Sequence, residues 1–536
     1  MATSVASPIV LEAFPVVGRR SEWGFGILLT GGLTALAVAV HGYHPYAEDG
    51  GLYMAGVKRL IDPALYPHET AFVTEHLRFS LFAPAVAGLV RWSHLRLNLV
   101  FLLLYVASFW VTLFAAWLLA ERCFASRTAR CGAVTLLAVW MTLPIAGTAL
   151  MLMDPYVTAR SISTPCALLA LVGALRFVLP EGGEGKRGLM LACGALIVAA
   201  AMHPLMAADA LGCVLILGCV SSASGWVRRW ATMALCSATV LAAGVLWRLS
   251  PAEGALYRRA AATRHYWFLS QWQWYELIGL AAPLIILAVV ALSRRHRVNA
   301  AREALSRMAI AAGITAVIVA LLFARLGAAN YVVARLQPLR VFQLVYVVMI
   351  LMLGAAGAEW VLKRQPVRWA VALALLCGVM AFADRQTFPD SPHLELPHVL
   401  FHGASENPWE QAFLWIRQNT PKDALFALDA NYIAKPGEDA QCFRAIAERS
   451  ALPDYSKDGG EVSITPRLAP AWAAGQAAQA RLSTETDAQR ESTLGPLGVT
   501  WMVLDSAAVT DFPCGFENSA VKVCRLPQEV AGSVLR

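Results

Sequence analysis

Directly after its first long apolar segment, at residues 41–53, the chain reads HGYHPYAEDGGLY. Two adjacent carboxylates, Glu48 and Asp49, therefore stand at the end of a segment long enough to enter a membrane. We interpret the pair as a reactive centre, an interpretation that requires the rest of the chain to bring other polar groups to the same side of the membrane. A plainer interpretation is also open, because carboxylates favour helix N-termini and this pair would cap a helix beginning near Gly50.

The composition is that of a membrane protein. Of the 536 residues, 58% are hydrophobic and 15% are charged, and the mean hydropathy is +0.54. A soluble domain typically carries about 25% charged residues. The net charge of +8 comes mainly from Arg. Many Arg residues lie between apolar segments, which favours orientation by the positive-inside rule over nucleic-acid binding.

The long apolar runs predict a mainly α protein, a polytopic bundle of about eleven membrane spans. Each span needs roughly 20 residues. The spans are expected at 23–40, 97–120, 131–150, 163–179, 188–202, 205–220, 230–247, 275–292, 308–323, 341–360 and 369–383. His203-Pro204 divides the two spans on either side of it, because proline interrupts a helix. The run at 79–92 is short and contains Pro84, so we expect a helix lying at the membrane surface or dipping into the membrane.

A second region with a different composition follows the spans. Residues 1–383 are predicted to form the transmembrane module, with a first outside loop at about 41–96, and residues 384–536 a small exported α/β domain. Helices are expected at 408–418 and 471–481, and buried strands at 424–428 and 500–504. If this domain is exported, Cys514 and Cys524 could form a disulfide.

Arg density predicts the orientation. With the N-terminus in the cytoplasm, the short cytoplasmic connections are the more basic ones. The outside loops then collect the unusual polar groups. These are Glu48, Asp49, Asp154, Arg160, His203, Arg258, Arg259, Arg335 and Arg340. Carboxylates can take a proton or hold a divalent cation, and Arg and His can hold a phosphate leaving group.

Each of these residues also has a structural interpretation. Asp154 before Pro155 could cap a helix, and His203 could serve only a helix break. Arg335 and Arg340 could be anchors at the membrane interface. The functional interpretation is favoured because all of these residues are predicted to lie on the same side of the membrane.

The acidic pair directly after the first span resembles the motif of the GT-C superfamily of membrane glycosyltransferases. WIRQNTPKDA at residues 415–424 is similar to the start of the exported domain in many such proteins. The resemblance implies a polyprenyl-phosphate-linked sugar donor, with Asp49 as the catalytic base and Glu48 assisting it or binding a cation. Asp154 resembles a second acidic position of some members. Mg²⁺ or Mn²⁺ at Glu48 and Asp49 is a further implication, but the first loop lacks a spaced DxD. The chain also lacks a WWD-type motif, which argues against an oligosaccharyltransferase.

The sequence thus predicts an inverting glycosyltransferase of the bacterial inner membrane, acting on a lipid or glycan acceptor of the envelope at the periplasmic face. Arg335 or Arg340, with Arg258 or Arg259, would bind the donor phosphate, and Asp154, Arg160 and His203 would complete the substrate site. Two alternatives stay open. One is a transporter or flippase for a lipid-linked substrate, which would use charged residues inside the spans. The span interiors are nearly free of such residues, and Asp209 is the exception. The other is a non-catalytic scaffold of the envelope.

Overall fold

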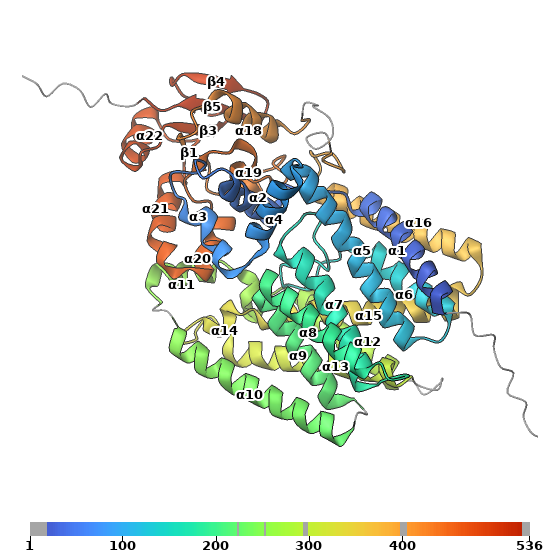
Figure 1. Ribbon diagram of the computed structural model, residues 1–536. Helices are drawn as coiled ribbons and strands as arrows, with labels where there is room; N and C mark the ends of the chain where they lie inside the picture. The colour runs from blue at the N-terminus through green and yellow to red at the C-terminus, as the bar shows by residue number, and fades with distance from the viewer. Residues whose placement is uncertain (1–18, 222–223, 251–252, 293–298, 397–404, 528–536) are drawn as a thin grey trace, which may run out of the picture.

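A computed structural model describes residues 19–221, 224–250, 253–292, 299–396 and 405–527. The first part of the chain is helical throughout (Figure 1). Its helices are α1 (Arg19–His41), α2 (Glu48–Ile61), α3 (Ala71–Thr74), α4 (Phe82–Ser93), α5 (Leu97–Cys123), α6 (Arg127–Val139), α7 (Ala159–Val178) and α8 (Gly185–Met202). They continue with α9 (Pro204–Val220), α10 (Gly225–Leu249), α11 (Ala255–Ala262), α12 (Trp274–Leu292), α13 (Ala300–Phe323), α14 (Val332–Arg335), α15 (Phe342–Gly357) and α16 (Pro366–Thr387). Short 3₁₀ turns include η1 (His76–Phe79) and η4 (Pro338–Val341).

The bundle is that of a multi-pass membrane protein. Eight helices in the described residues are long and apolar enough to span a membrane. They lie at Glu22–His41, Leu97–Cys123, Ala159–Val178, Gly185–Met202, Gly225–Arg248, Ala300–Phe323, Val332–Leu362 and Pro366–Thr387. Two further apolar helices, Pro204–Val220 and Trp274–Val290, are shorter. The predicted break at His203-Pro204 is confirmed, since α8 ends at Met202 and α9 begins at Pro204.

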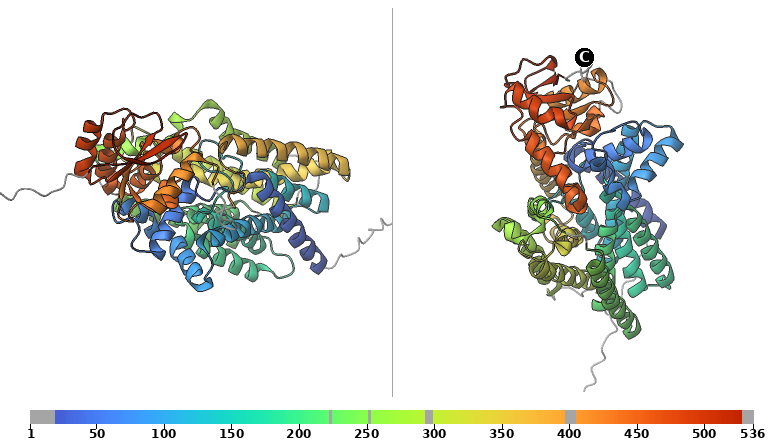
Figure 2. Two further views of the ribbon diagram at one scale, coloured as in Figure 1. Left: turned by 90° about the horizontal axis from the view of Figure 1, so that it is seen from above. Right: turned by 90° about the vertical axis from the view of Figure 1, so that its left-hand side faces the viewer.

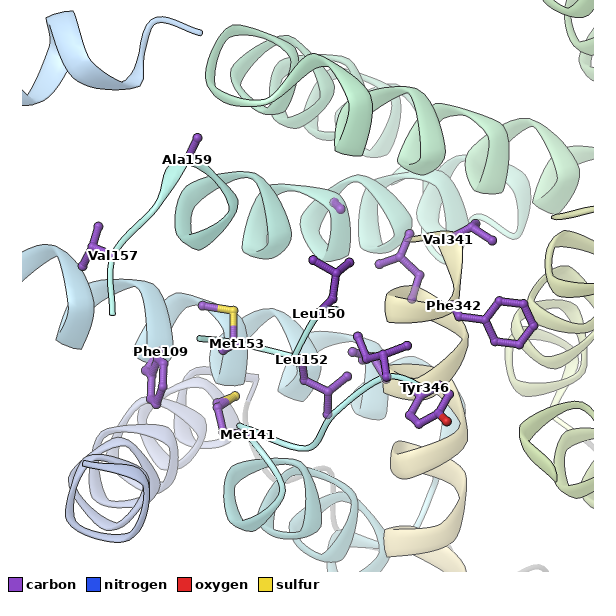
Figure 3. Packing of buried hydrophobic residues seen from close by; sticks show 14 of the residues in the cluster. Phe109, Met141, Leu150, Leu152, Met153, Val157, Ala159, Val341, Phe342 and Tyr346 are labelled. Carbon is purple, nitrogen blue, oxygen red and sulfur yellow. The ribbon is translucent and has the colours of Figure 1, made fainter. Parts of the chain in front are cut away.

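The prediction of a membrane span at 131–150 is wrong. The helix there is α6, with 13 residues, or about 20 Å of helix at 1.5 Å per residue. After it the chain turns back on itself, and Pro144 pairs with Met151 in an isolated bridge. Figure 3 shows apolar side chains of this segment packed in the core beside α5 and α15. The segment is apolar because protein buries it, and this burial cannot be told from contact with lipid by composition alone.

Residues 408–527 form a compact α/β unit at one end of the bundle (Figures 1 and 2). Its helices are α18 (Pro408–Asn419), α19 (Phe443–Ala447), α20 (Lys457–Ile464), α21 (Ala469–Gln479) and α22 (Asp487–Leu494). Its strands are β1 (Leu425–Ala427), β2 (Ser450–Ala451), β3 (Trp501–Asp505), β4 (Cys514–Glu517) and β5 (Val521–Arg525). They form one sheet in the order β2-β1-β3-β5-β4, parallel from β2 to β3 and antiparallel from β3 to β4.

Several predictions for this unit are confirmed. The helix expected at 408–418 is α18, the helix at 471–481 is α21, and the two expected strands are β1 and β3. Asn407 caps α18 by accepting hydrogen bonds from the amides of Trp409 and Glu410, as expected for an Asn before a helix. The disulfide between Cys514 and Cys524 is present and joins the neighbouring strands β4 and β5.

A cluster of buried ionisable side chains holds the loop between α1 and α2 against the chain that follows α16. His44 is fully buried, and its Nδ1 lies 2.9 Å from Oε1 of Glu395 and its Nε2 3.4 Å from Oδ1 of Asp384. Burial alone would lower the pKa of His44, but hydrogen bonds with Asp384 and Glu395 raise it to about 9. His44 is therefore a buried imidazolium that fixes the position of the chain just before the acidic pair.

Helix α2 also packs tightly against the C-terminal unit. The Nζ of Lys58 donates to the carbonyl of Ala445 at 2.6 Å, and the hydroxyl of Tyr66 donates to the carbonyl of Arg444 at 2.8 Å. Gly51 of α2 lies where a Cβ would stand 2.1 Å from the Cβ of Cys442 and 2.5 Å from the carbonyl oxygen of Tyr46. The close approach of α2 to the C-terminal unit at Cys442 thus depends on Gly51, which has no side chain.

Gly51→Ala is expected to destabilise the protein by about 1–3 kcal/mol, because the added methyl group has no room between α2 and Cys442. The measurement is the midpoint of thermal unfolding of the purified protein in detergent. Gly88→Ala on α4 is the matched control, since a Cβ there meets nothing within 4 Å. Equal midpoints for the two variants would contradict the close contact at Gly51.

Candidate active site

A cavity of about 840 Å³, lined by both charged and apolar side chains, lies where the helix bundle meets the C-terminal unit. Its walls come from the first turn of α2, the loop before α7, the α8–α9 break, the chain around η4, and α20. Of the nine predicted site residues, the cavity collects Glu48, Asp49, Asp154, Arg160, His203, Arg335 and Arg340. These residues come from separate parts of the sequence, all of which were predicted to lie on the outer side.

Helix α2 begins at Glu48 itself, so both carboxylates lie in its first turn, where the helix dipole favours negative charge. The side chain of Asp49 is one-third exposed to the cavity. The Nη1 of Arg160 lies 3.0 Å from its Oδ2, and the Nζ of Lys457 lies 3.2 Å from its Oδ1. Lys457 also pairs with Glu48. The acidic pair is thus held between two cations.

Arg160 bridges Asp49 to the second predicted acid. Its Nε and Nη2 both donate to Oδ2 of Asp154, at 3.2 and 2.9 Å. Thr158 fixes this geometry, because it caps α7 in a capping box with Ser161 and so sets Arg160 in the first helical turn. The result is a row of alternating charges, Asp154, Arg160, Asp49 and Lys457.

The two acids differ in their ionisation. Burial opposes the charge of Asp49, but Lys457 and Arg160 outweigh it and hold the pKa of Asp49 well below its usual value. Burial dominates at Asp154 and raises the pKa of that carboxyl despite its contact with Arg160. Asp49 is therefore a firmly ionised carboxylate and a weak proton acceptor in this arrangement. Its role as the base stays a prediction.

Arg340 is the unusual cation of the cavity. Its guanidinium makes no hydrogen bond or ion pair with any residue that the structure describes, and its Nε is buried without a partner. Arg160 and Lys457, by contrast, are neutralised by carboxylates. An unpaired guanidinium away from bulk water is unfavourable unless an anion binds to it.

His203 lies in the same cavity, at the break between α8 and α9. Burial, followed by the nearby charges of Arg340 and Arg160, lowers its pKa to about 3, so the ring is neutral. The Nδ1 atom accepts a hydrogen bond from the amide of Met206 at 3.3 Å. This bond assigns the remaining proton to Nε2, which makes the ring a hydrogen-bond donor there.

Three of the arginines predicted to bind phosphate lie outside the cavity or are already bound to protein groups. Arg258 and Arg259 do not line the cavity. Arg258 donates to the carbonyls of Ala328 and Ala329 instead. Arg335 does line the cavity, but its Nη2 donates to the hydroxyl of Tyr257 at 2.6 Å and lies 3.6 Å from Glu253. These contacts tie α11 to the chain before α15, and charge and side of the membrane alone could not distinguish this role from ligand binding.

The sequence does not predict the cavity residues that α20 and η1 supply. Lys457 is 408 positions from Asp49, and no local motif marks it. Glu461 lies one turn further along α20, and its Oε1 is 2.9 Å from Nδ1 of His76 in η1. Only the approach of the C-terminal unit to the first loop reveals these pairs, and an isolated Lys or Glu on a short helix carries no signal for it.

The donor set around the acidic pair does not fit a bound Mg²⁺ or Mn²⁺. Among the described residues no group of three or more His, Cys, Asp or Glu side chains is arranged to hold a metal ion. The ammonium group of Lys457 lies against oxygens of both Glu48 and Asp49, where a divalent ion would need to coordinate.

Fold and cavity together define a class: a multi-pass membrane protein with a charged cavity where its helix bundle meets a C-terminal α/β unit. No protein-family model matches the chain, and no curated protein matches it.

Among solved structures, the chain is similar to the oligosaccharyltransferase of Archaeoglobus fulgidus. The apo form of that protein has 11% sequence identity and a TM-score of 0.49, over 90% of this chain and 70% of that one. Its complex with Zn and sulfate has 13% identity and a TM-score of 0.46, over 89% and 68%. The enzyme, named AglB, in complex with an inhibitory peptide and a dolichol-phosphate has 12% identity and a TM-score of 0.40, over 91% and 70%. At these values the matches do not say which residues of this chain react.

Proposed function

We propose that the chain is a membrane glycosyltransferase of GT-C type that moves a sugar from a polyprenyl-phosphate-linked donor to an acceptor in the cavity. In this proposal residues 1–383 form the transmembrane module and 384–536 the exported domain. The N-terminus lies in the cytoplasm of a bacterium, and the cavity opens at the periplasmic face of its inner membrane. The acceptor is a lipid or glycan of the envelope.

The observation that carries the proposal is the unpaired guanidinium of Arg340 in the cavity. Arg160 and Lys457 are neutralised by carboxylates there, and Arg264 donates to the carbonyls of Ser456 and Tyr455. A phosphate or diphosphate is the natural partner for such a group, because guanidinium binds phosphate oxygens through charge-assisted hydrogen bonds. The Nε2 proton of His203 supplies a second donor from a neutral ring. An anion site with these two donors favours a substrate that brings its own negative charge.

The apolar part of the cavity wall favours a lipid-linked donor over a soluble one. Leu150 and Met151 line the cavity from the loop before α7, and Met202, Leu205 and Ala208 line it around the α8–α9 break. Both α8 and α9 are apolar helices of the bundle. A lipid tail could therefore lie along these helices while its phosphate reaches Arg340.

The chemistry that suits this arrangement is direct displacement at the anomeric carbon. An acceptor oxygen or nitrogen forms the new bond from one face while the bond to the phosphate oxygen breaks on the other, so the configuration inverts. The phosphate leaves with the electron pair of the broken bond, and the proton of the acceptor passes to solvent in the cavity. Arg340 and His203 would stabilise the charge that grows on the leaving phosphate. The ionised Asp49, with Asp154 nearby, would stabilise the positive charge that develops at the anomeric carbon, and these donors and carboxylates are set in place before the reaction.

The test is a transfer assay with the purified protein in lipid nanodiscs. Undecaprenyl-phosphate carrying radiolabelled glucose, mannose or arabinose is offered together with envelope extract as the acceptor source. Release of undecaprenyl phosphate with label appearing in the extract is the expected result. If none of these donors is consumed but labelled lipid crosses the bilayer of proteoliposomes, the transporter alternative replaces the transferase. If neither occurs, the proposal of an active transferase fails for these donors.

A further inference from the structure

We propose that Lys457 is the resident cation of the acidic pair, occupying the position in which a divalent metal would coordinate Glu48 and Asp49. The transfer reaction then proceeds without a bound metal. The first statement concerns the side chains alone, whereas the second rests on the proposed transferase function.

The contacts of Lys457 carry the assignment. Its Nζ lies 3.2 Å from Oδ1 of Asp49 and in contact with Oε2 of Glu48, and its side chain is only 14% exposed. Burial would lower the pKa of Lys457, but the two carboxylates raise it, so the group stays charged. The ammonium carries three donors, and the described protein residues satisfy two of them. The third is left for a substrate oxygen.

The backbone that carries Lys457 is held by a buried network, so the contact is not a chance meeting of surface side chains. The Oδ1 of Asp454 accepts from the amide of Lys457 at 2.6 Å and so holds the first residue of α20. Asp458 is fully buried, and two guanidinium nitrogens of Arg444 donate to its carboxylate oxygens at 2.7 and 2.9 Å. Paired charges inside a protein hold a geometry firmly, because a half-broken pair is strongly unfavourable.

Lys457 and a metal exclude one another at this site. Mg²⁺ binds oxygen at about 2.0–2.1 Å in a nearly octahedral shell and keeps several waters. The ammonium approaches the same two carboxylates, so it blocks that shell by its volume and repels the ion by its charge. Removing the ammonium would leave Glu48 without a cation, and Asp49 with Arg160 only.

The experiment measures Mn²⁺ binding by the full-length protein, using the loss of the electron paramagnetic resonance signal of free Mn²⁺. Lys457→Met keeps the length of the side chain and removes its charge. The expected result is weak binding by the wild type, at least a tenfold tighter Mn²⁺ dissociation constant for Lys457→Met, and loss of that gain in the double variant Lys457→Met with Glu48→Gln. Lys457→Arg keeps the charge and should bind as weakly as the wild type.

Lys422→Met is the control, because Lys422 pairs with a single carboxylate, that of Asp62, at the surface. No gain of Mn²⁺ affinity by Lys457→Met, or an equal gain by Lys422→Met, would overturn the assignment. So would a wild-type protein that already binds one Mn²⁺ tightly and loses it on Glu48→Gln.

A second arm uses the transfer assay to separate the two claims. Wild-type transfer should survive EDTA, whereas any transfer by Lys457→Met should depend on added Mn²⁺. Wild-type transfer that EDTA abolishes and Mn²⁺ restores would overturn metal independence and leave the transferase proposal standing. If the wild type shows no transfer but Mn²⁺ binding is as expected, the transferase proposal fails and the assignment of Lys457 stands. The binding measurement needs neither donor nor acceptor.

Discussion

Arg340→Gln is expected to lower consumption of the polyprenyl-phosphate donor by about 100- to 1000-fold, the usual effect of removing one donor that stabilises a developing oxyanion. Its guanidinium has no partner among the described residues, so the substrate phosphate is the anion it can serve. The measurement is the initial rate of undecaprenyl phosphate release. Arg340→Lys should retain part of the activity, because it keeps the charge and loses the paired donors.

The stability of the same variant distinguishes a substrate-binding residue from a structural one. Removing an unpaired charge from the cavity should leave the unfolding midpoint unchanged or raise it. Arg258→Gln is the matched control for activity, since Arg258 contacts backbone carbonyls outside the cavity. A rate for Arg340→Gln within threefold of the wild type, or a large fall in its midpoint, would contradict the phosphate role.

Asp49→Asn is expected to reduce transfer at least 100-fold, because it removes the charge between Arg160 and Lys457 while keeping the shape of the side chain. Its effect on stability should be modest, about 1–2 kcal/mol, since solvent screens a carboxylate that is one-third exposed. Initial rates and unfolding midpoints check the two parts. Asp62→Asn is the control, because Asp62 lies in the same loop and pairs with Lys422 at the surface.

The pH dependence of transfer tests what Asp49 does. Its pKa is lowered in the fold, so the stability that it contributes is present above the ordinary carboxyl pKa and is lost only as the pH falls through the lower folded value. Asp49 should therefore add no titration to the rate between pH 5 and 8. A fall in the wild-type rate in that range that is absent from the residual rate of Asp49→Asn would instead assign it the role of the base.

Much of the bundle could be predicted because the membrane imposes a simple demand on composition. Apolar length located helices such as α5 and α13, and Pro204 located the break between α8 and α9. The segment after α6 defeated the same reasoning, since apolar side chains buried by other helices resemble those that face lipid. Periodicity cannot separate these two environments.

The candidate site was predictable to the extent that its residues are close in sequence or share a side of the membrane. Asp154 and Arg160 are six positions apart and meet directly. Arg258 has the same charge and the same predicted side as Arg340, and nothing in the sequence says that only Arg340 reaches the cavity. The positions of side chains within one loop depend on packing, which a single sequence does not display.

The distance along the chain between Asp49 and Lys457 has a consequence for biogenesis. A ribosome delivers the acidic loop first, then the helices up to α16, and α20 only afterwards. A nascent chain can thus complete its bundle while the two carboxylates still lack their lysine. In the proposed enzyme, the charge balance of the acidic pair is therefore reached only after the bundle has been made.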